Sequence, residues 1–149
     1  MGSLLRTAEG LGVEQIYLTG YTPYPRTDYD ERLPHVAAKI HKQIQKTALG
    51  AEELALWKHI PDVLDVIKSL QQQGFTIAGL EQTKASKNIT KWQTPSKVAV
   101  VIGRETLGIE TNVLNACDKV LEIPMFGRKE SFNVVQAAAM ALYHCKFVG

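Results

Sequence analysis

Apolar and polar residues alternate along this chain in blocks that favour helices and strands in turn. Apolar positions three or four residues apart mark the helical blocks, whereas 98–102 is an uninterrupted, mostly β-branched run. Such a run is typical of a central strand covered on both faces. The pattern predicts helices at 2–12, 34–46, 61–74, 110–117 and 131–147, and strands at 13–18, 57–60, 75–81, 98–102 and 119–123.

The order of these elements predicts an α/β fold with an open, mostly parallel sheet and helices on both faces. No repeat, low-complexity segment or linker interrupts residues 1–149, so we expect one compact domain. Its most informative corner is a strand that stops at Pro124, a charged loop, and a helix that begins at Ser131. Strand-to-helix corners of this kind hold anions and cofactors in α/β proteins.

Composition places the chain among ordinary globular proteins, with 45% hydrophobic and 21% charged residues. A net charge of +2 neither demands nor excludes a nucleic-acid partner. The chain has no apolar run of membrane-spanning length and no signal-peptide pattern, so we expect a cytoplasmic protein without a membrane partner. Cys117 and Cys145 are expected to be reduced, buried thiols, and four scattered histidines predict no metal site.

Two segments leave alternatives open. Residues 20–33 form a long loop with three tyrosines, two prolines and two arginines. It is either a solvated connection whose tyrosines pack on the domain, or a loop that contacts single-stranded RNA. The lysine-rich helix 34–46 is either a solvated face or a set of phosphate contacts.

Three strand exits predict a small-molecule site. Leu80 and Glu81 end one strand, Gly103 and Glu105 follow the next, and 124–133 follows the last. Because the carboxyl ends of parallel strands share one edge, ligands bind there. No dinucleotide or nucleoside-triphosphate glycine loop and no nucleophile elbow is found, which disfavours enzymes that depend on those motifs.

Three segments resemble the motifs of the SpoU (TrmH-type) RNA ribose methyltransferases in order and spacing. Residues 2–8 (Gly-Ser-Leu-Leu-Arg-Thr-Ala) resemble motif 1, and 100–109 (Val-Val-Ile-Gly-Arg-Glu-Thr-Leu-Gly-Ile) resemble motif 2. Residues 123–127 (Ile-Pro-Met-Phe-Gly) with 131–137 (Ser-Phe-Asn-Val-Val-Gln-Ala) resemble motif 3. The resemblance therefore covers essentially the whole chain.

The resemblance implies an S-adenosylmethionine-dependent enzyme that methylates a ribose 2′-hydroxyl in tRNA or rRNA. It implies the trefoil-knotted SPOUT fold, in which the C-terminal segment threads through a loop. It also implies a homodimer in which an arginine reaches across the interface to the partner's cofactor. It assigns the cofactor to Leu80, Glu81, Gly103, Ile123, Met125, Ser131 and Phe132, and the chemistry to Arg6, Glu105, Ser131 and Asn133.

Physical chemistry limits some of these roles. A guanidinium keeps its proton to a pKa above about 12, so Arg6 is better suited to clamp a phosphate than to act as a base. Glu105 either caps the following helix, orients Arg6 or receives a proton. Ser131 and Asn133 can cap the last helix and hold a ligand at the same time.

The chain departs from the family pattern at two places. The motif-1 asparagine would stand two residues before Gly2, and the strand that normally precedes it is absent as well. We therefore expect a single methyltransferase domain that lacks the usual first strand, either because the chain is truncated or because a partner completes the sheet. Phe132 stands where the family commonly has leucine. The alternative functions are a catalytically silent, knotted RNA-binding module and a different α/β enzyme that uses a nucleotide cofactor such as NAD.

Overall fold

The computed structural model describes residues 1–149, which form two compact units, unit 1 (residues 1–62) and unit 2 (residues 63–149). Unit 1 contains α1 (Gly2–Gly10), β1 (Ile16–Thr19), α2 (Pro34–Ala48), α3 (Ala51–Leu54) and β2 (Trp57–Ile60). Unit 2 contains α4 (Val63–Gln72), β3 (Thr76–Leu80), β4 (Lys87–Asn88), η1 (Ile89–Lys91), β5 (Val98–Ile102), α5 (Thr111–Ala116), β6 (Lys119–Glu122), α6 (Val134–Tyr143) and the π-helical turn η2 (His144–Val148).

Unit 1 is a small α/β layer in which β1 and β2 pair in parallel. Its core joins Leu5 of α1 to Ile44 and Ala48 of α2. Gly2 is buried at the contact between α1 and α2, and a side chain there would collide with the Ile44 carbonyl oxygen. Glycine at this position therefore lets the two helix backbones approach closely.

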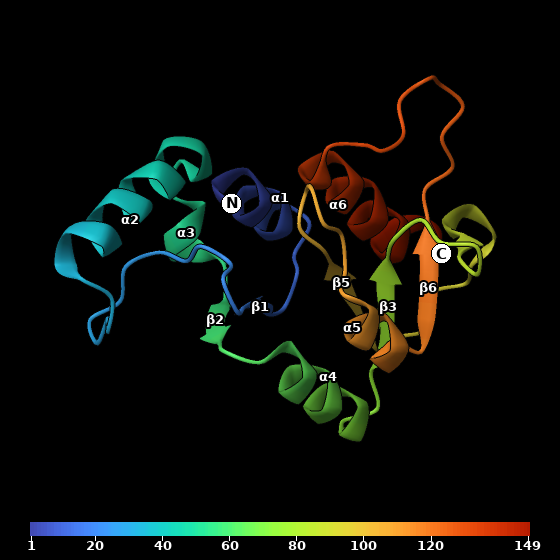
Figure 1. The fold of residues 1–149 in the computed structure, drawn as a ribbon, viewed down its shortest axis with the longest axis horizontal. Helices are drawn as coiled ribbons and strands as arrows, with labels where there is room; N and C mark the ends of the chain where they lie inside the picture. Colours follow the sequence, from blue (N-terminus) through green and yellow to red (C-terminus); the bar gives the residue numbers. More distant parts are fainter. The chain divides into compact units, whose positions relative to one another are not determined.

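Unit 2 is built on a parallel four-stranded sheet with the order β4-β6-β3-β5. The arrows of β3 and β6 point the same way, and the segment between β6 and α6 projects beyond their ends (Figure 1). The carboxyl ends of these strands thus share one edge of the sheet, as the sequence predicts for a ligand site.

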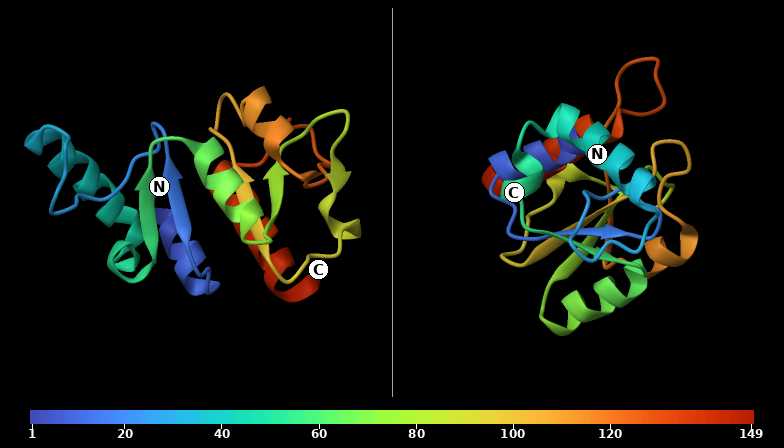
Figure 2. Two further views of the ribbon diagram at one scale, coloured as in Figure 1. Left: turned by 90° about the horizontal axis from the view of Figure 1, so that it is seen from below. Right: turned by 90° about the vertical axis from the view of Figure 1, so that its left-hand side faces the viewer.

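Helices cover both faces of this sheet, which confirms the predicted fold class. On one face Ala78 and Leu121 pack with Ala141 of α6. On the other face Gly79 meets the side chains of Leu114 and Cys117, at and just after α5. Figure 2 shows α6 on the opposite side of the sheet from α4.

The order of the strands bears on the predicted knot. Strands β3 and β4 follow each other in the sequence, yet β6, which comes later, pairs with both and lies between them. This strand order is compatible with a threaded C-terminal segment but does not require one. The threading itself stays a prediction.

Strand β5 corrects one expectation. The apolar run 98–102 predicts a central strand covered on both faces, but within the four-stranded sheet β5 lies at the edge, pairs only with β3, and is half-buried throughout. Strands β3 and β6 are the central pair. Unbroken hydrophobicity reports a tendency to be buried, and it carries no information on which neighbours a strand pairs with.

Several element boundaries also differ from the sequence expectation. Helix α1 ends at Gly10, two residues before the predicted end, and α6 begins three residues later than the predicted Ser131. The helix predicted at 34–46 extends to Ala48, where Leu49 and Gly50 turn the chain in left-handed conformations before the unpredicted short helix α3 begins at Ala51. Boundary shifts of this size reflect tertiary packing that local patterns do not contain.

The two cysteines are free and half-buried, so they are less buried than the sequence predicts. Burial raises the pKa of the Cys117 thiol to about 11, and its Sγ donates to the Val113 carbonyl oxygen at 3.2 Å. Burial raises the pKa of the Cys145 thiol as well, so neither thiol is a ready nucleophile. No helix has both the length and the hydropathy of a membrane span, and no three His, Cys, Asp or Glu side chains group as metal ligands would.

Candidate functional site

A cavity of about 430 Å³ opens in unit 2 at the carboxyl ends of β3, β5 and β6. Three segments line it: the end of β3, the exit loop of β5, and the chain from β6 to the first turn of α6. Its size lies in the range of small-molecule sites. The residues expected from the sequence that line it are Leu80, Glu81, Gly103, Glu105, Ile123, Met125, Ser131 and Phe132.

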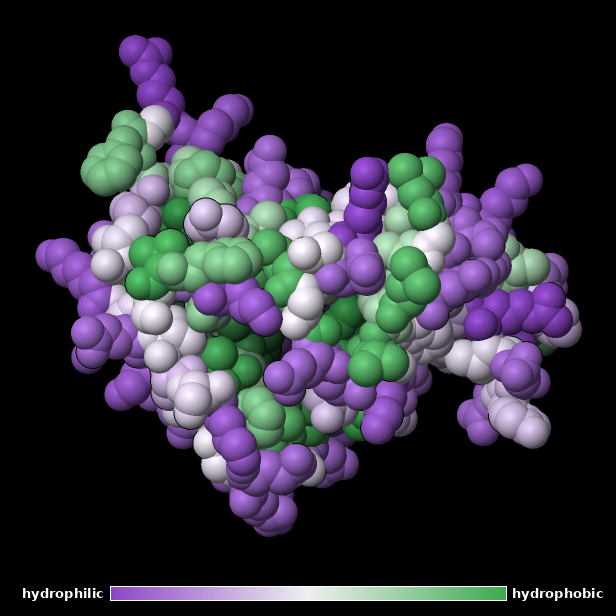
Figure 3. Space-filling model, turned by 180° about the vertical axis from the view of Figure 1, so that it is seen from behind, coloured by the Kyte–Doolittle hydropathy of each residue, from purple (hydrophilic) through white to green (hydrophobic).

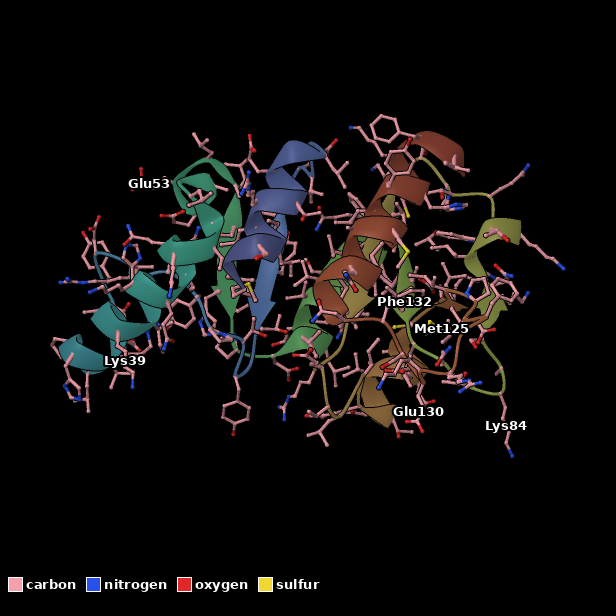
Figure 4. All side chains as sticks on the ribbon, turned by 90° about the horizontal axis from the view of Figure 1, so that it is seen from above. Lys39, Glu53, Lys84, Met125, Glu130 and Phe132 are labelled. Carbon is pink, nitrogen blue, oxygen red and sulfur yellow. The ribbon has the colours of Figure 1, made fainter.

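Figure 4 labels three of the lining residues, Met125, Glu130 and Phe132, on the chain between β6 and α6. The residues from both of the later motifs therefore meet around one space, although Ile123 follows Gly103 by twenty positions in the sequence.

The loop 103–109 is closed upon itself by two backbone hydrogen bonds. The Arg104 N–H donates to the Gly108 carbonyl oxygen at 3.0 Å, and the Gly108 N–H donates to the Arg104 carbonyl oxygen at 2.9 Å. Gly108 has φ +66°, in the left-handed region that favours glycine. A side chain at Gly103 would collide with the Gly108 backbone. Both glycines of motif 2 are thus required by the shape of the loop.

Glu81 fastens this loop to the end of β3. Its Oε2 accepts a hydrogen bond from the Ile109 N–H at 2.9 Å, and its Oε1 accepts one from the Gln82 N–H at 3.1 Å. A side chain at Gly108 would meet the same carboxylate. Glu81 therefore shapes the cavity wall as well as lining it.

Asn133 joins the other wall to the loop 103–109. As the N-cap of α6, its Oδ1 accepts from the Val135 N–H at 2.9 Å. Its Nδ2 donates to Glu105 Oε1 at 3.0 Å. Of the roles open to Asn133, capping is confirmed. Glu105, which could have capped the following helix, is instead tied to the start of α6.

The sequence reading missed several lining residues. Glu122 ends β6 and accepts a hydrogen bond from Ser86 Oγ, and Glu130 lies in the loop before α6. An acid at the end of a strand was the usable signal, since Glu81 stands in the equivalent place on β3. The other unpredicted lining residues are Gln82, Ile102, Arg104, Thr106, Leu107, Gly108, Ile109, Val134 and Ala137.

The charges of the lining favour a cationic ligand. Four glutamates and one arginine line the cavity, so carboxylates outnumber cations by three. Negative lining attracts a positively charged group and repels a pyrophosphate. Apolar side chains such as Leu80, Ile102 and Ile123 provide surface for an uncharged ring.

Arg6 belongs to unit 1, where it is exposed on α1. Its expected role at the cavity stays a prediction.

The loop 20–33 of unit 1 resolves into a fixed base and exposed tips. Arg32 lies over the Tyr24 ring at 3.6 Å and binds both oxygens of Asp30, at 2.8 and 2.6 Å. The ring of Tyr24 stacks on His59 at 4.0 Å between centroids. Hydrogen bonds from Arg32 hold the pKa of the Asp30 carboxyl well below its usual range. Tyr24 thus packs on the unit, whereas Tyr29 is 95% exposed.

The sequence also matches a known family. Residues 1–143 match the SpoU rRNA Methylase family. The chain belongs to this family. The identification from the three motifs is therefore confirmed over nearly the whole sequence.

Curated relatives carry names from RNA modification. The chain is 28% identical over 142 residues to the 23S rRNA (guanosine-2′-O-)-methyltransferase RlmB of Neisseria meningitidis. This match covers 95% of this chain and 51% of that protein. It is 32% identical over 115 residues to the tRNA (guanosine(18)-2′-O)-methyltransferase of Saccharomyces cerevisiae, which covers 72% of this chain and 8% of that protein. The chain spans about half the length of the bacterial relatives it matches, at 52% and 51%.

Solved structures of the family share the fold. The A. aeolicus TrmH/SpoU tRNA modifying enzyme superposes with a TM-score of 0.76 at 20% identity, over 97% of this chain and 66% of that one. The SpoU methyltransferase AviRb from Streptomyces viridochromogenes, in complex with the cofactor AdoMet, superposes with a TM-score of 0.75 at 21% identity, over 97% of this chain and 51% of that one.

Proposed function

We propose that this chain is an S-adenosylmethionine-dependent RNA methyltransferase that acts on the 2′-hydroxyl of a ribose in tRNA or rRNA. The observation that carries the proposal is the acid-lined cavity, because motif 2 and motif 3 of the family build its walls. Relatives named as guanosine 2′-O-methyltransferases of tRNA and 23S rRNA support the reaction class.

The cavity residues fit S-adenosylmethionine on chemical grounds. This cofactor supplies a methyl group on a positively charged sulfur, and the excess of carboxylates suits that charge. Leu80, Ile102 and Ile123 would hold the adenine ring, with Gly103, Met125, Ser131 and Phe132 around the remaining groups. A polyphosphate cofactor such as NAD fits the same lining poorly.

The residues of the chain divide the work of methyl transfer. Arg6 would hold the phosphate beside the target ribose and favour loss of the hydroxyl proton through its positive charge. Glu105 would orient the partner's Arg6 or receive that proton, and its bond to Asn133 keeps the carboxylate at the cavity wall. Ser131 would hold the ribose. Orientation of this kind can contribute roughly 7–11 kcal/mol in ideal cases.

Helix α2 is the proposed binding surface for the RNA phosphate backbone. Lys39, Lys42 and Lys46 are exposed along it at spacings of three and four, which places them on one face. The helix contains no acidic residue, and neither of the chain's two ion pairs involves these lysines. Unpaired cations in a row suit a phosphate chain. The exposed Tyr29 of the loop 20–33 would add a stacking surface.

A second copy of the chain is the proposed partner of the C-terminal helix. Met140, Tyr143 and Phe147 are 38%, 55% and 62% exposed and share one face of α6 and η2. Figure 3 shows apolar side chains that reach the surface between polar ones. An exposed apolar stripe is typical of an interface. A dimer that separates on Tyr143→Glu, observed by analytical ultracentrifugation, would support this assembly.

A cytoplasmic location, where tRNA and rRNA are held, stays a prediction.

The decisive experiment follows a labelled methyl group from S-adenosylmethionine into tRNA or rRNA. Alkali cleaves RNA through a free 2′-hydroxyl, so methylation of the ribose leaves the label in alkali-resistant dinucleotides. Label in ordinary mononucleotides would overturn the ribose assignment. Absence of S-adenosylmethionine binding in calorimetry, together with retained RNA binding, would favour the catalytically silent module.

Arg6→Ala tests the assigned chemistry. We expect the variant to lose methylation while it binds S-adenosylmethionine like the wild type, because the guanidinium acts on the RNA. Lys58→Ala is the matched control, since Lys58 is an exposed cation on β2 with no proposed role. Full turnover by Arg6→Ala would sink this assignment.

A further inference from the structure

The tip of the loop between β6 and α6 has a distinctive position in unit 2. The tip comprises residues 126–129 (Phe-Gly-Arg-Lys). Met125 before it and Glu130 after it both line the cavity, whereas the four tip residues do not. Figure 4 labels these two flanking residues near each other, and Figure 1 shows the segment between them as a projection. The tip therefore stands at the rim of the cavity.

Phe126 is the most exposed large apolar side chain in the chain, at 96%. Unit 2 contains one pair of packed aromatic rings, which joins Tyr143 to Phe147 and does not include Phe126. A phenyl ring forfeits hydrophobic stabilisation when it remains in water. A ring held fully open beside a ligand cavity is therefore available for a partner that covers it.

Two cations follow the ring directly. Arg128 and Lys129 are both exposed. The chain's two ion pairs join Arg32 to Asp30 and Arg104 to Glu110, so neither cation of the tip is neutralised by an ion pair. The tip thus combines one open aromatic face with two available positive charges.

We propose that this tip grips the target nucleotide of a single-stranded RNA, with the base stacked on Phe126 and flanking phosphates bound by Arg128 and Lys129. Aromatic rings that stack bases beside cations that bind phosphates are the common means of holding unpaired RNA. The inference rests on the proposed function and extends it. With the base on the rim, the attached ribose lies at the mouth of the cavity, where the methyl group would be supplied.

Base stacking on Phe126 also determines which form of RNA the tip selects. Every base offers a π face, so Phe126 contributes affinity for an unpaired nucleotide without selecting its identity. Bases in a duplex are already stacked on their neighbours and cannot use the ring unless they flip out. The tip should therefore discriminate single-stranded from double-stranded RNA.

The test measures binding of a fluorescein-labelled single-stranded 15-mer oligoribonucleotide by anisotropy. Phe126→Ala is expected to raise the Kd about 5- to 100-fold, and Phe126→Leu nearly as much, because leucine keeps the apolar surface but has no π face. Phe126→Tyr should restore binding. The same oligonucleotide annealed to its complement should show no dependence on residue 126. Binding of S-adenosylmethionine, measured by calorimetry, should stay within about twofold in all variants.

The two cations are tested through salt dependence. For the Arg128→Ala/Lys129→Ala double variant, the plot of log binding constant against log salt concentration should become less steep. Its negative slope should lose about 1.4 in magnitude, since each phosphate contact to a single strand contributes about 0.7. The control is Lys68→Ala/Lys119→Ala, which removes two exposed lysines from α4 and from the start of β6, away from the carboxyl edge. Its slope should not change.

The proposal would be overturned, with the proposed function intact, by wild-type RNA affinity in Phe126→Ala with normal methylation or by equal slopes in the two double variants. Equal binding by Phe126→Leu and Phe126→Tyr would replace stacking by simple apolar contact and would also overturn it. A wild-type chain that neither binds RNA nor methylates it would remove both the proposed function and this inference.

Discussion

Two loops form facing parts of the same cavity, and they are built in opposite ways. The loop 103–109 is closed by paired backbone hydrogen bonds, contains a left-handed glycine, and is fastened to β3 through Glu81. The loop 123–133 is tied at its helix end through Asn133, while its tip extends into solvent with Phe126 exposed. The hydrogen bond between Asn133 and Glu105 connects the two.

The difference separates two tasks. A loop whose shape is fixed by its own backbone can hold a constant ligand such as a cofactor. A loop that is anchored at its ends and open at its tip can vary its tip residues without disturbing the cavity. We therefore expect substitutions in the loop 103–109 to change stability and cofactor binding, and substitutions in the tip to change RNA binding.

Gly103→Ala should cause the largest loss of stability among these variants. The added carbon would collide with the backbone of Gly108, which cannot move without breaking the two hydrogen bonds to Arg104. We expect a loss of about 3 kcal/mol in the free energy of unfolding and a weaker affinity for S-adenosylmethionine. Denaturant unfolding and calorimetry would measure both. Wild-type values for both quantities would show that the loop is not rigid.

Glu81→Ala should have the next largest effect. The change leaves the N–H groups of Ile109 and Gln82 without their carboxylate partner, and we expect a loss of about 2 kcal/mol in the free energy of unfolding. Glu14→Ala, which removes an exposed acid of unit 1, is the control and should stay within about 0.5 kcal/mol. Equal losses in the two variants would contradict the anchoring role of Glu81.

Asn133→Ala should cost about 1 kcal/mol of unfolding free energy, because it removes the cap of α6 and the bond to Glu105 together. Asn133→Ser separates the two, since serine caps a helix but has no amide to reach Glu105. Combining each variant with Glu105→Ala in a double-mutant cycle would isolate the connection between the loops. Additive losses for Asn133→Ala and Glu105→Ala would mean that the connection contributes nothing.

Gly127→Ala should have the smallest effect and completes the comparison with Gly103→Ala. A side-chain carbon at Gly127 has no atom within 4 Å, and its φ lies outside the left-handed region. The free energy of unfolding should therefore stay within about 0.5 kcal/mol of the wild type. The same glycine-to-alanine change thus probes a filled and an open position. A large loss at Gly127 would show that the tip is packed, contrary to its exposure.

Much of the fold and of the site could be predicted from the sequence. The alternation of elements predicts the parallel α/β architecture, and strand 98–102 appears with the predicted bounds. Eight of the predicted site residues line one cavity, because they follow strands whose carboxyl ends meet at one edge. These successes share a physical basis: side-chain periodicity and strand direction are local properties of the chain.

The errors concern properties that depend on distant neighbours. Strand 98–102 looks central in the sequence but lies at the edge of its sheet, because the pairing partner of a strand is chosen by topology. The acids Glu122 and Glu130 become cavity residues only when β6 lies beside β3. Whether Tyr24 packs or contacts RNA could not be settled until Arg32 was seen against its ring.

By itself, the sequence determined the family, the order of the elements and the residue types that the site requires, since these are written in motifs and periodicity. Only the tertiary structure decided how those residues are used. It placed Glu81 against Ile109, joined Asn133 to Glu105, and left Phe126 open at the rim. Hydrogen bonds and exposure depend on segments that are far apart in the chain, and no local pattern records them.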